Sequence, residues 1–420
     1  MKQPLQSSLW SSPDLRLVLP ARALSYAGDS IALIALMLRV SDTGGPAATT
    51  ALLLAFALPT VAMIPFAGKL VDSHDSRTVL VSASLLQAAA GVCLALVDGL
   101  AATLALVCVL QVGQAVAGPA WAALIPRIVG EELVGRATGV SQALTGVAML
   151  AGSAAGGVLV AWKGETGALL VDAGTFAMLA VVACLVKTRR RPVPSSGEVE
   201  RGGLSVGLRT LFADDLLKIL VPALWVFILV GEALNVVEVF LIRDELGLGP
   251  DGYGAVLAAQ GAGAVVGAWS CGRLTSDPGR ARAVLLGTGS LGLAAVVMGV
   301  APGVVLLVLG AVVMGAGGGL LNAATSTLVV TRSPEAVRGR VIAALTGTAR
   351  ASSLLALLLG GAVGSLLGPR LTFVAGGAAG AVTAMVAGVL VWCGQAALTK
   401  SVPREPLPRE VRAESGSARG

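Results

Sequence analysis

Long apolar stretches recur along the chain and are separated by short polar segments. They cover roughly residues 17–38, 48–67, 78–97, 101–122, 138–160, 167–187, 216–241, 252–272, 283–301, 304–329, 341–366 and 371–394. Each stretch has about the 20 apolar residues that a helix needs to cross a bilayer, and a helix satisfies its own backbone hydrogen bonds there. The pattern therefore predicts an all-α membrane protein with twelve transmembrane helices, six on each side of a polar interval.

Composition supports a membrane location. Of the 420 residues, 55% are hydrophobic and only 13% are charged, whereas soluble domains have about 25% charged residues. A soluble fold of this length would lack the polar residues to cover its surface. The 55 glycines are typical of membrane helices that pack closely together. These numbers exclude a soluble enzyme.

The positive charges predict how the helices are oriented. When successive loops are assigned to alternate sides, 25 of the 30 lysines and arginines fall on the side that holds both termini, and four fall on the other side. Cytoplasmic loops carry such an excess. Both termini are therefore predicted to be cytoplasmic, with the protein in the inner (plasma) membrane. Topology also explains the net charge of +6, so no nucleic-acid partner is expected.

A weak internal repeat relates the two sets of six helices. Two short sequence signatures each recur 204 residues later, namely Gly68-Lys69-Leu70 with Gly272-Arg273-Leu274, and Gly135-Arg136 with Gly339-Arg340. Parallel repeats of this kind form two bundles with a binding site at their interface in several transporters. We predict six-helix bundles over residues 1–187 and 216–394, a mobile cytoplasmic linker over 188–215, and a disordered cytoplasmic tail over 395–420.

The first signature continues into a sequence that resembles the loop 2–3 motif of the major facilitator superfamily. That motif has a glycine, then an aspartate, then basic residues, and the chain keeps Gly68, Asp72 and Arg77. It departs from the motif at Ser73 and Ser76, where basic residues are usual. The resemblance implies the major facilitator fold and a transport function, and it covers roughly residues 15–395.

The resemblance also implies a gate. In the family, the aspartate of this motif engages the cytoplasmic start of helix 11, which here carries Arg338 and Arg340. An anion near a helix N-terminus and two cations is stabilised by both, so Asp72 is expected to help close the inner side. The alternative is an ordinary helix cap, with Asp75 or Ser76 capping the next helix.

The fifth apolar stretch shows a second resemblance, to the antiporter motif of the same superfamily. The matching glycines are Gly139, Gly152, Gly156 and Gly157. Ala148 and Ser153 stand where a glycine and a proline are usual. In the family this motif is associated with export, and the first three helices look like the branch of macrolide-efflux and siderophore-export proteins. The alternative role for these glycines is close helix packing.

Acidic residues inside the apolar stretches are the main functional candidates. A charge in the bilayer costs about 2.5–3.5 kcal/mol on insertion scales, so each such residue is a functional hypothesis. Asp29 lies in the first stretch, and Glu232, Asn235 and Glu238 lie in the seventh. Burial favours the protonated form of a carboxyl group, which suits a proton carrier. The alternative is a structural ion pair with Arg350, which could instead bind a substrate anion.

Three further polar residues are candidate hydrogen-bonding groups of the cavity, namely Gln111, Gln114 and Asn322. Helix packing uses the same residue types. Asp172 lies near the outer end of the sixth stretch, and its position there predicts a place at the membrane interface.

Together these features predict a secondary active transporter that exports a small organic molecule, a drug or secondary metabolite, by proton antiport. Its partners are that substrate, protons and the lipid bilayer, and it is expected to be a monomer. The alternatives are an importer on the same fold and a membrane receptor or scaffold without transport. No enzyme activity, cofactor or metal site is expected, because the chain has one histidine and no phosphate-binding GxxxxGK[ST] loop.

Overall fold

The computed structural model describes residue 10 and residues 12–130, 133–189, 203–274, 276–333 and 338–401, and the regular secondary structure of this part is helical. The helices of the first half are α1 (Pro13–Ala62), α2 (Ile64–Ser73), α3 (Ser76–Leu96), α4 (Leu100–Val129) and α5 (Val134–Leu185). They are followed by α6 (Gly203–Ala213), α7 (Leu217–Phe240), a short π-helix η3 (Leu241–Glu245), α8 (Pro250–Cys271), α9 (Asp277–Gly299), α10 (Val304–Arg332) and α11 (Arg338–Ser401).

Nine helices in the described part of the chain are long and apolar enough to span a membrane. Three of them, α1, α5 and α11, are interrupted at Gly45, Gly164 and Gly368, whose φ angles are 61°, 71° and 75°. Glycine adopts positive φ without the steric cost that other residues meet, so the chain turns back on itself there. Dividing these helices at the glycines yields twelve spans, which confirms the fold class that the apolar pattern predicts.

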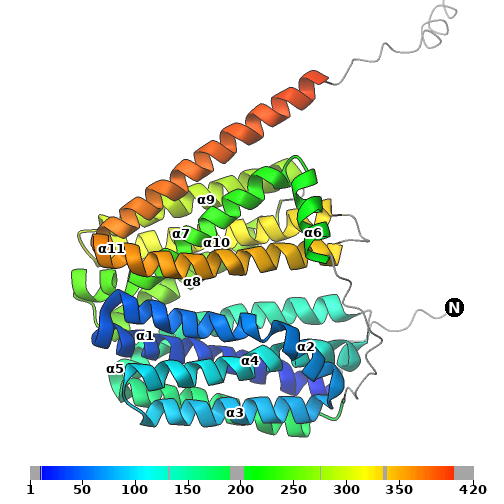
Figure 1. Cartoon of the computed structure of the whole chain (residues 1–420), viewed down its shortest axis with the longest axis vertical. Helices are drawn as coiled ribbons and strands as arrows, with labels where there is room; N and C mark the ends of the chain where they lie inside the picture. The colour runs from blue at the N-terminus through cyan, green and yellow to red at the C-terminus, as the bar shows by residue number, and fades with distance from the viewer. Residues whose placement is uncertain are drawn as a thin grey trace, which may run out of the picture.

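The helices form two halves that follow the chain order (Figure 1). In the first half, α1 packs against α5 and α4, and α3 against both α4 and α5. In the second half, α7 and α9 pack against α11, and α10 against α8 and α9. The offset of 204 residues reappears in the backbone. Gly164 and Gly368 break α5 and α11 at equivalent positions, and Gly99 and Gly303 are the residues that precede α4 and α10.

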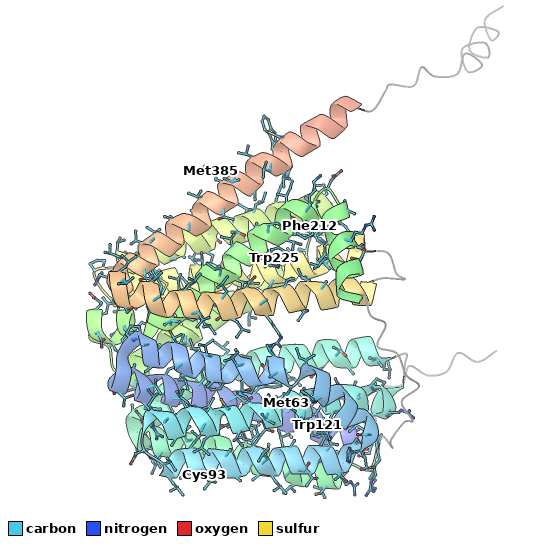
Figure 2. The ribbon with its side chains drawn as sticks, viewed as in Figure 1. Met63, Cys93, Trp121, Phe212, Trp225 and Met385 are labelled. Carbon is cyan, nitrogen blue, oxygen red and sulfur yellow. The ribbon has the colours of Figure 1, made fainter. Side chains whose placement is uncertain are left out.

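Helix α6 lies inside the interval that the sequence predicts to be a mobile linker. It forms because its apolar side has a partner, since Leu211 is fully buried and packs in the second half. Phe212 meets Trp225 of α7 edge-on, with 5.9 Å between ring centroids (Figure 2). Helix α11 also continues to Ser401, beyond the predicted start of the tail. The proposed domain boundaries otherwise stay predictions.

The two ends of the spans define two faces of the protein. We call the face with the breaks at Gly45, Gly164 and Gly368 the far face, and the face with the start of α1 and with α6 the near face. The near face is on the right in Figure 1. Contacts between the halves run through α5 with α8, and through α1 with α11 and α7.

These contacts lie towards the far face. A Cβ on Gly157 would lie 2.5 Å from the Pro250 carbonyl oxygen and 2.9 Å from Gly254 Cα, so the backbones of α5 and α8 touch. A Cβ on Gly361 would overlap the side chain of Thr50, which joins α11 to α1. Close approach of this kind needs small residues on the facing helices. The far face is therefore closed in this structure.

Ion pairs reinforce the far face, and their arrangement differs between the halves. In the first half, Arg39 pairs with Glu165 at 2.8 Å and donates to the Leu94 carbonyl oxygen, also at 2.8 Å. In the second half, Arg370 pairs with Glu245 at 2.8 Å and donates to the carbonyl oxygen of Ala301. The cation is thus on the first helix of one half and on the last helix of the other.

Arg243 lies 204 residues after Arg39, at the equivalent position of the second half. Because the cation of the far-face ion pair in that half is Arg370, Arg243 has no ion-pair partner in its own half among the described residues. Arg243 instead donates across the interface to Asp42 at 2.6 Å and to the Ser41 hydroxyl at 3.2 Å. Both hydrogen bonds connect η3, which directly follows α7, to the first span of α1. Arg243 therefore joins the halves on the far face.

Removing Arg243 is expected to weaken closure of the far face. The reporter is Thr50→Cys, placed where Thr50 is 8% exposed and touches α11, in a background without the natural cysteines. A partly exposed ion pair contributes about 0.2–1 kcal/mol, so Arg243→Ala should raise the rate of labelling by a water-soluble maleimide roughly 1.4- to 5-fold. Exchanging the charges, Asp42→Arg with Arg243→Asp, should restore protection.

The matched control is Arg39→Ala, which removes the equivalent cation but breaks only a pair within one half. Its labelling rate should stay at that of the parent. An equal increase in both arginine variants, or no increase in Arg243→Ala, would show that the pair does not hold the halves together.

Candidate functional site

A cavity with a volume of about 240 Å³ lies inside the first half. Its polar lining consists of Tyr26, Asp29, Ser30, Gln111, Gln114 and Asp172. Its apolar lining includes Leu33, Leu36, Phe56, Val107, Leu110 and Met149. A cavity with mostly apolar walls and a few converging polar groups is the usual form of a small-molecule site.

Asp29 is the half-buried carboxylate of this cavity, near the middle of the first span of α1. Helical periodicity places it on one face with Arg22 and Tyr26, which precede it by seven and three residues. Arg22 Nη2 donates to the Tyr26 hydroxyl at 3.2 Å. Arg22 lies about one helical turn before Tyr26, towards the near face. None of the ion pairs in the described residues involves Asp29.

Asp172 corrects the sequence interpretation. Its place in the sixth stretch predicts the membrane interface, but it is 1% exposed and lines the same cavity as Asp29. It lies eight residues after the break at Gly164, about 12 Å along the helix. Its Oδ1 has no hydrogen-bond partner among the described groups. The apolar pattern could not reveal this, because it does not tell which face of a helix meets its neighbours.

A glycine makes the approach of Asp172 sterically feasible. A Cβ on Gly28 would lie 2.7 Å from Asp172 Oδ1 and 2.7 Å from Thr175 Oγ1. Any larger residue at position 28 would displace the second span of α5 or turn the carboxylate away. The Gly28-Asp29 pair in an apolar stretch is therefore the sequence signal that could have pointed to a close partner helix at this depth.

A smaller cavity of about 20 Å³ adjoins the larger one on the side of Arg22. Both are lined by Tyr26, Asp29 and Gln114. This volume is enough for about one water molecule. Gln87 donates to Gln114 at 3.0 Å, and Trp121, labelled in Figure 2, lines the same space with an Nε1 that has no hydrogen-bond partner among the described groups. Polar groups thus continue from Asp29 towards the near face.

In the second half, Glu232 lies away from this cavity. It accepts a hydrogen bond from Ser353 of α11 at 2.8 Å and one from Asn235 at 3.2 Å, and Asn235 itself is exposed. The expected ion pair with Arg350 does not form among the described residues, and Arg350 is exposed one turn from Ser353.

Glu238 and Asn322 are likewise not brought to the cavity. Glu238 is 4% exposed, lies close to the buried Tyr253 of α8, and has an Oε1 without a hydrogen-bond partner among the described groups. Six residues after Glu232, it faces a different helix, as the helical rotation of about 240° requires. Asn322 is exposed on α10. Of the residues that the sequence predicts for the cavity, the structure groups Asp29, Gln111 and Gln114.

The gating residues are placed only in part. The surroundings of Gly68 and the side chains of Asp72, Arg338 and Arg340 lie outside the part of the structure that is described, so the expected contact of Asp72 with the two arginines stays a prediction. Arg77 donates to the Val186 carbonyl oxygen at 2.5 Å, at the end of α5. A cation at a helix C-terminus stabilises its free carbonyl groups. Asp75 caps α3 by accepting from the Arg77 amide at 2.9 Å.

The glycines of the fifth span fall into three environments. Gly152 and Gly156 pack against the α1 backbone, since a Cβ on Gly152 would overlap the Ala27 carbonyl oxygen and one on Gly156 would lie 3.1 Å from Ile31 Cα. Gly157 instead faces α8 of the other half. A Cβ on Gly139 would meet no described atom of another element within 4 Å, so this glycine faces open space.

Comparison with known families agrees with this architecture. A family model described as a transmembrane secretion effector matches residues 15–416. The uncharacterized MFS-type transporter YfiS of Bacillus subtilis is 26% identical over 378 residues, which cover 86% of this chain and 88% of YfiS. The multidrug efflux pump Tap of Mycolicibacterium fortuitum is 26% identical over 380 residues, covering 86% of this chain and 91% of Tap.

Solved structures share the fold at low sequence identity. A bacterial homologue of the iron transporter ferroportin, crystallised in an inward-facing state, superposes with a TM-score of 0.71 at 16% identity, covering 92% of this chain and 99% of that one. The likeness concerns the arrangement of the helices. Together with the family match, it identifies this chain as a multi-pass membrane protein of the transporter class, not an enzyme.

The environments of the glycines predict different effects of one substitution. Gly152→Val places a branched side chain against the α1 backbone, and overpacking of this kind costs about 1–3 kcal/mol. We expect a melting temperature lower by several degrees for the detergent-purified protein. The control, Gly139→Val, puts the same side chain into open space and should melt within about a degree of the parent. Equal losses in both variants would contradict the assignment.

Proposed function

Because the chain belongs to the transmembrane secretion effector family of major facilitator transporters, we propose that it exports a small organic molecule by proton antiport. The observation that carries this proposal is the cavity of about 240 Å³ in which Asp29 lies among apolar walls. An ionisable side chain inside a membrane bundle is a functional group by default. A carboxylate can hold either a proton or a cationic or polar substrate group, and antiport requires that exchange.

The proposed orientation places both termini and the near face in the cytoplasm, as the excess of positive charge predicts. Because the halves touch on the far face, the structure then corresponds to an inward-facing state. In that state the substrate enters from the cytoplasm. The proposed location is the inner (plasma) membrane, with bundles over 1–187 and 216–394 moving against each other around the linker.

In the proposed cycle, Asp29 releases its proton to the cytoplasm in the inward-facing state and the substrate then binds. The near face closes, the far face opens, and a proton from outside displaces the substrate. The proton moves inward and the substrate outward, and neither is chemically changed. Tyr26, Arg22 and the one-water cavity extend the polar surface towards the near face, which supplies the path for the leaving proton.

The two faces need opposite gates for this cycle. Arg243 with Asp42 holds the far face in the inward-facing state. We propose that Asp72 with Arg338 and Arg340 holds the near face in the other state, as the loop motif implies. Breaking one gate while forming the other keeps the cavity open to one side at a time, which secondary transport requires.

Two observations support export over import. The relatives include proteins named as the multidrug efflux pump Tap. The glycines of the fifth span also resemble the antiporter motif, and Gly157 lies at the contact between the halves where relative movement would occur. The importer predicted as an alternative differs only in the direction of flux, which vesicles measure directly.

The test uses inside-out membrane vesicles with an acidic interior, in which exported molecules accumulate. Ethidium and the uncharged dye Nile red serve as probes. We expect accumulation of at least one dye above that in vesicles without the protein, together with loss of the pH gradient on dye addition. Asp29→Asn should lower the gradient-driven part, because an amide cannot exchange a proton.

The matched control is Asp98→Asn, which neutralises an exposed carboxylate in the far-face turn between α3 and α4 and should leave transport unchanged. If Asp29→Asn accumulates dye with the same dependence on the pH gradient as the parent, the assignment of Asp29 is wrong. Gradient-driven loss of dye from the vesicles would instead identify an importer.

A further inference from the structure

The cavity contains a second carboxylate that the proposed cycle does not use. Asp172 approaches Asp29 from the second span of α5, through the space that Gly28 leaves open. The two acids come from helices more than 140 residues apart in the chain and line one cavity. No local sequence pattern announces this pair, since neither residue belongs to a motif.

Asp172 is a buried carboxylate that protein groups satisfy only in part. It is 1% exposed, and Oδ1 has no hydrogen-bond partner among the described groups. The Thr175 hydroxyl donates to the Asp172 backbone carbonyl at 2.8 Å. A buried polar group without partners is costly, and such groups in native proteins call for an explanation. The unpartnered oxygen belongs to a residue that lines the cavity, which points to a ligand.

The surroundings of the pair provide little compensating positive charge. The other polar groups that line the cavity are the hydroxyls of Tyr26 and Ser30 and the amides of Gln111 and Gln114. Arg22, on the adjoining small cavity, already donates to Tyr26. Within the described residues no ion pair includes either acid. Two carboxylates that share one site repel each other, and a bound cation relieves this repulsion.

The rest of the lining is apolar, from Leu33 and Leu36 on α1 to Val107 and Leu110 on α4, with Phe56 and Met149 completing the wall. A small inorganic cation would leave these surfaces in contact with water. A ligand with one positive group and a compact hydrocarbon body satisfies both parts of the cavity, since the body is driven there by burial of apolar area.

We propose that Asp29 and Asp172 together form the binding site for the positive group of an organic amine with a compact apolar body. The inference names the substrate class of the proposed transporter, and in that sense it rests on the proposed function. It does not depend on the direction of transport or on the coupling ion. Asp172 is assigned as a binding residue whose carboxylate contacts the ligand.

The test measures binding to the purified full-length protein in detergent by titration calorimetry. The probes share one hydrocarbon cage and differ in charge: 1-aminoadamantane is a cation, 1-adamantanol is neutral and 1-adamantanecarboxylate is an anion. We expect the parent to bind the amine at least tenfold more tightly than the alcohol, and the anion most weakly. A charge-assisted hydrogen bond of about 1.5–3 kcal/mol corresponds to roughly 10- to 150-fold in affinity.

Three variants separate charge from structure. Asp172→Asn should lower affinity for the amine about tenfold and leave affinity for the alcohol unchanged, and Asp29→Asn with Asp172→Asn should bind both probes equally. Gly28→Ala keeps both charges but displaces Asp172 Oδ1, so it should also weaken binding of the amine. Gly28→Ala therefore tests the role of the Asp172 carboxylate even if Asp172→Asn does not fold. Asp98→Asn should match the parent.

An unchanged preference for the amine in both Asp172→Asn and Gly28→Ala would overturn the proposal. So would equal affinity of the parent for the amine and the alcohol, or no detectable binding of the amine. Failure of the proposed function is a different result. If the amine binds in a way that depends on Asp172 but no dye is transported in vesicles, only the proposed transport function is contradicted. If dye is transported but the amine and the alcohol bind equally well, only this inference is contradicted.

Discussion

The cost of placing charged and unpaired polar groups in a hydrocarbon environment governs this structure. That cost is about 2.5–3.5 kcal/mol for a charge at a helix centre, and it explains why most ionic groups lie on the two faces of the protein. On the far face, arginines pair with acids and with the last carbonyl groups of neighbouring helices, as Arg39 and Arg370 do. With apolar helix surfaces in lipid, association depends on close packing, which the many glycines permit.

The internal repeat supplies a common scaffold, and its departures from symmetry carry the specific features. Gly164 and Gly368 break two helices at the same repeat position. The arginines at the equivalent positions 39 and 243 have different partners, one inside its half and one across the interface. The acids also differ, because Asp29 faces a cavity while Glu232 binds Ser353 of a neighbouring helix. The candidate binding groups are thus concentrated in the first half, on a symmetric framework.

The number of spans and the fold could be predicted from the sequence because the apolar stretches have the length that a bilayer sets. Asp29 could be predicted because a single acid is conspicuous in such a stretch. The surroundings of each side chain could not be predicted, since a uniformly apolar helix does not reveal which face meets its neighbours. For this reason the pattern places the buried Asp172 at the interface and pairs the exposed Arg350 with an acid. The sequence spacing also assigns Gly139 and Gly152 to the same motif. In the structure only Gly152 packs against a neighbouring helix, and Gly139 faces open space.

In the proposed transport cycle, a substrate cation and protons compete for the same carboxylates. The most direct measurement is the number of protons released when 1-aminoadamantane binds to the purified protein in weakly buffered solution, read with a pH-sensitive dye. We expect proton release by the parent, less from Asp29→Asn, and none from the variant in which Asp29 and Asp172 are both asparagine. Binding by the parent without proton release, or undiminished release from the double variant, would contradict it.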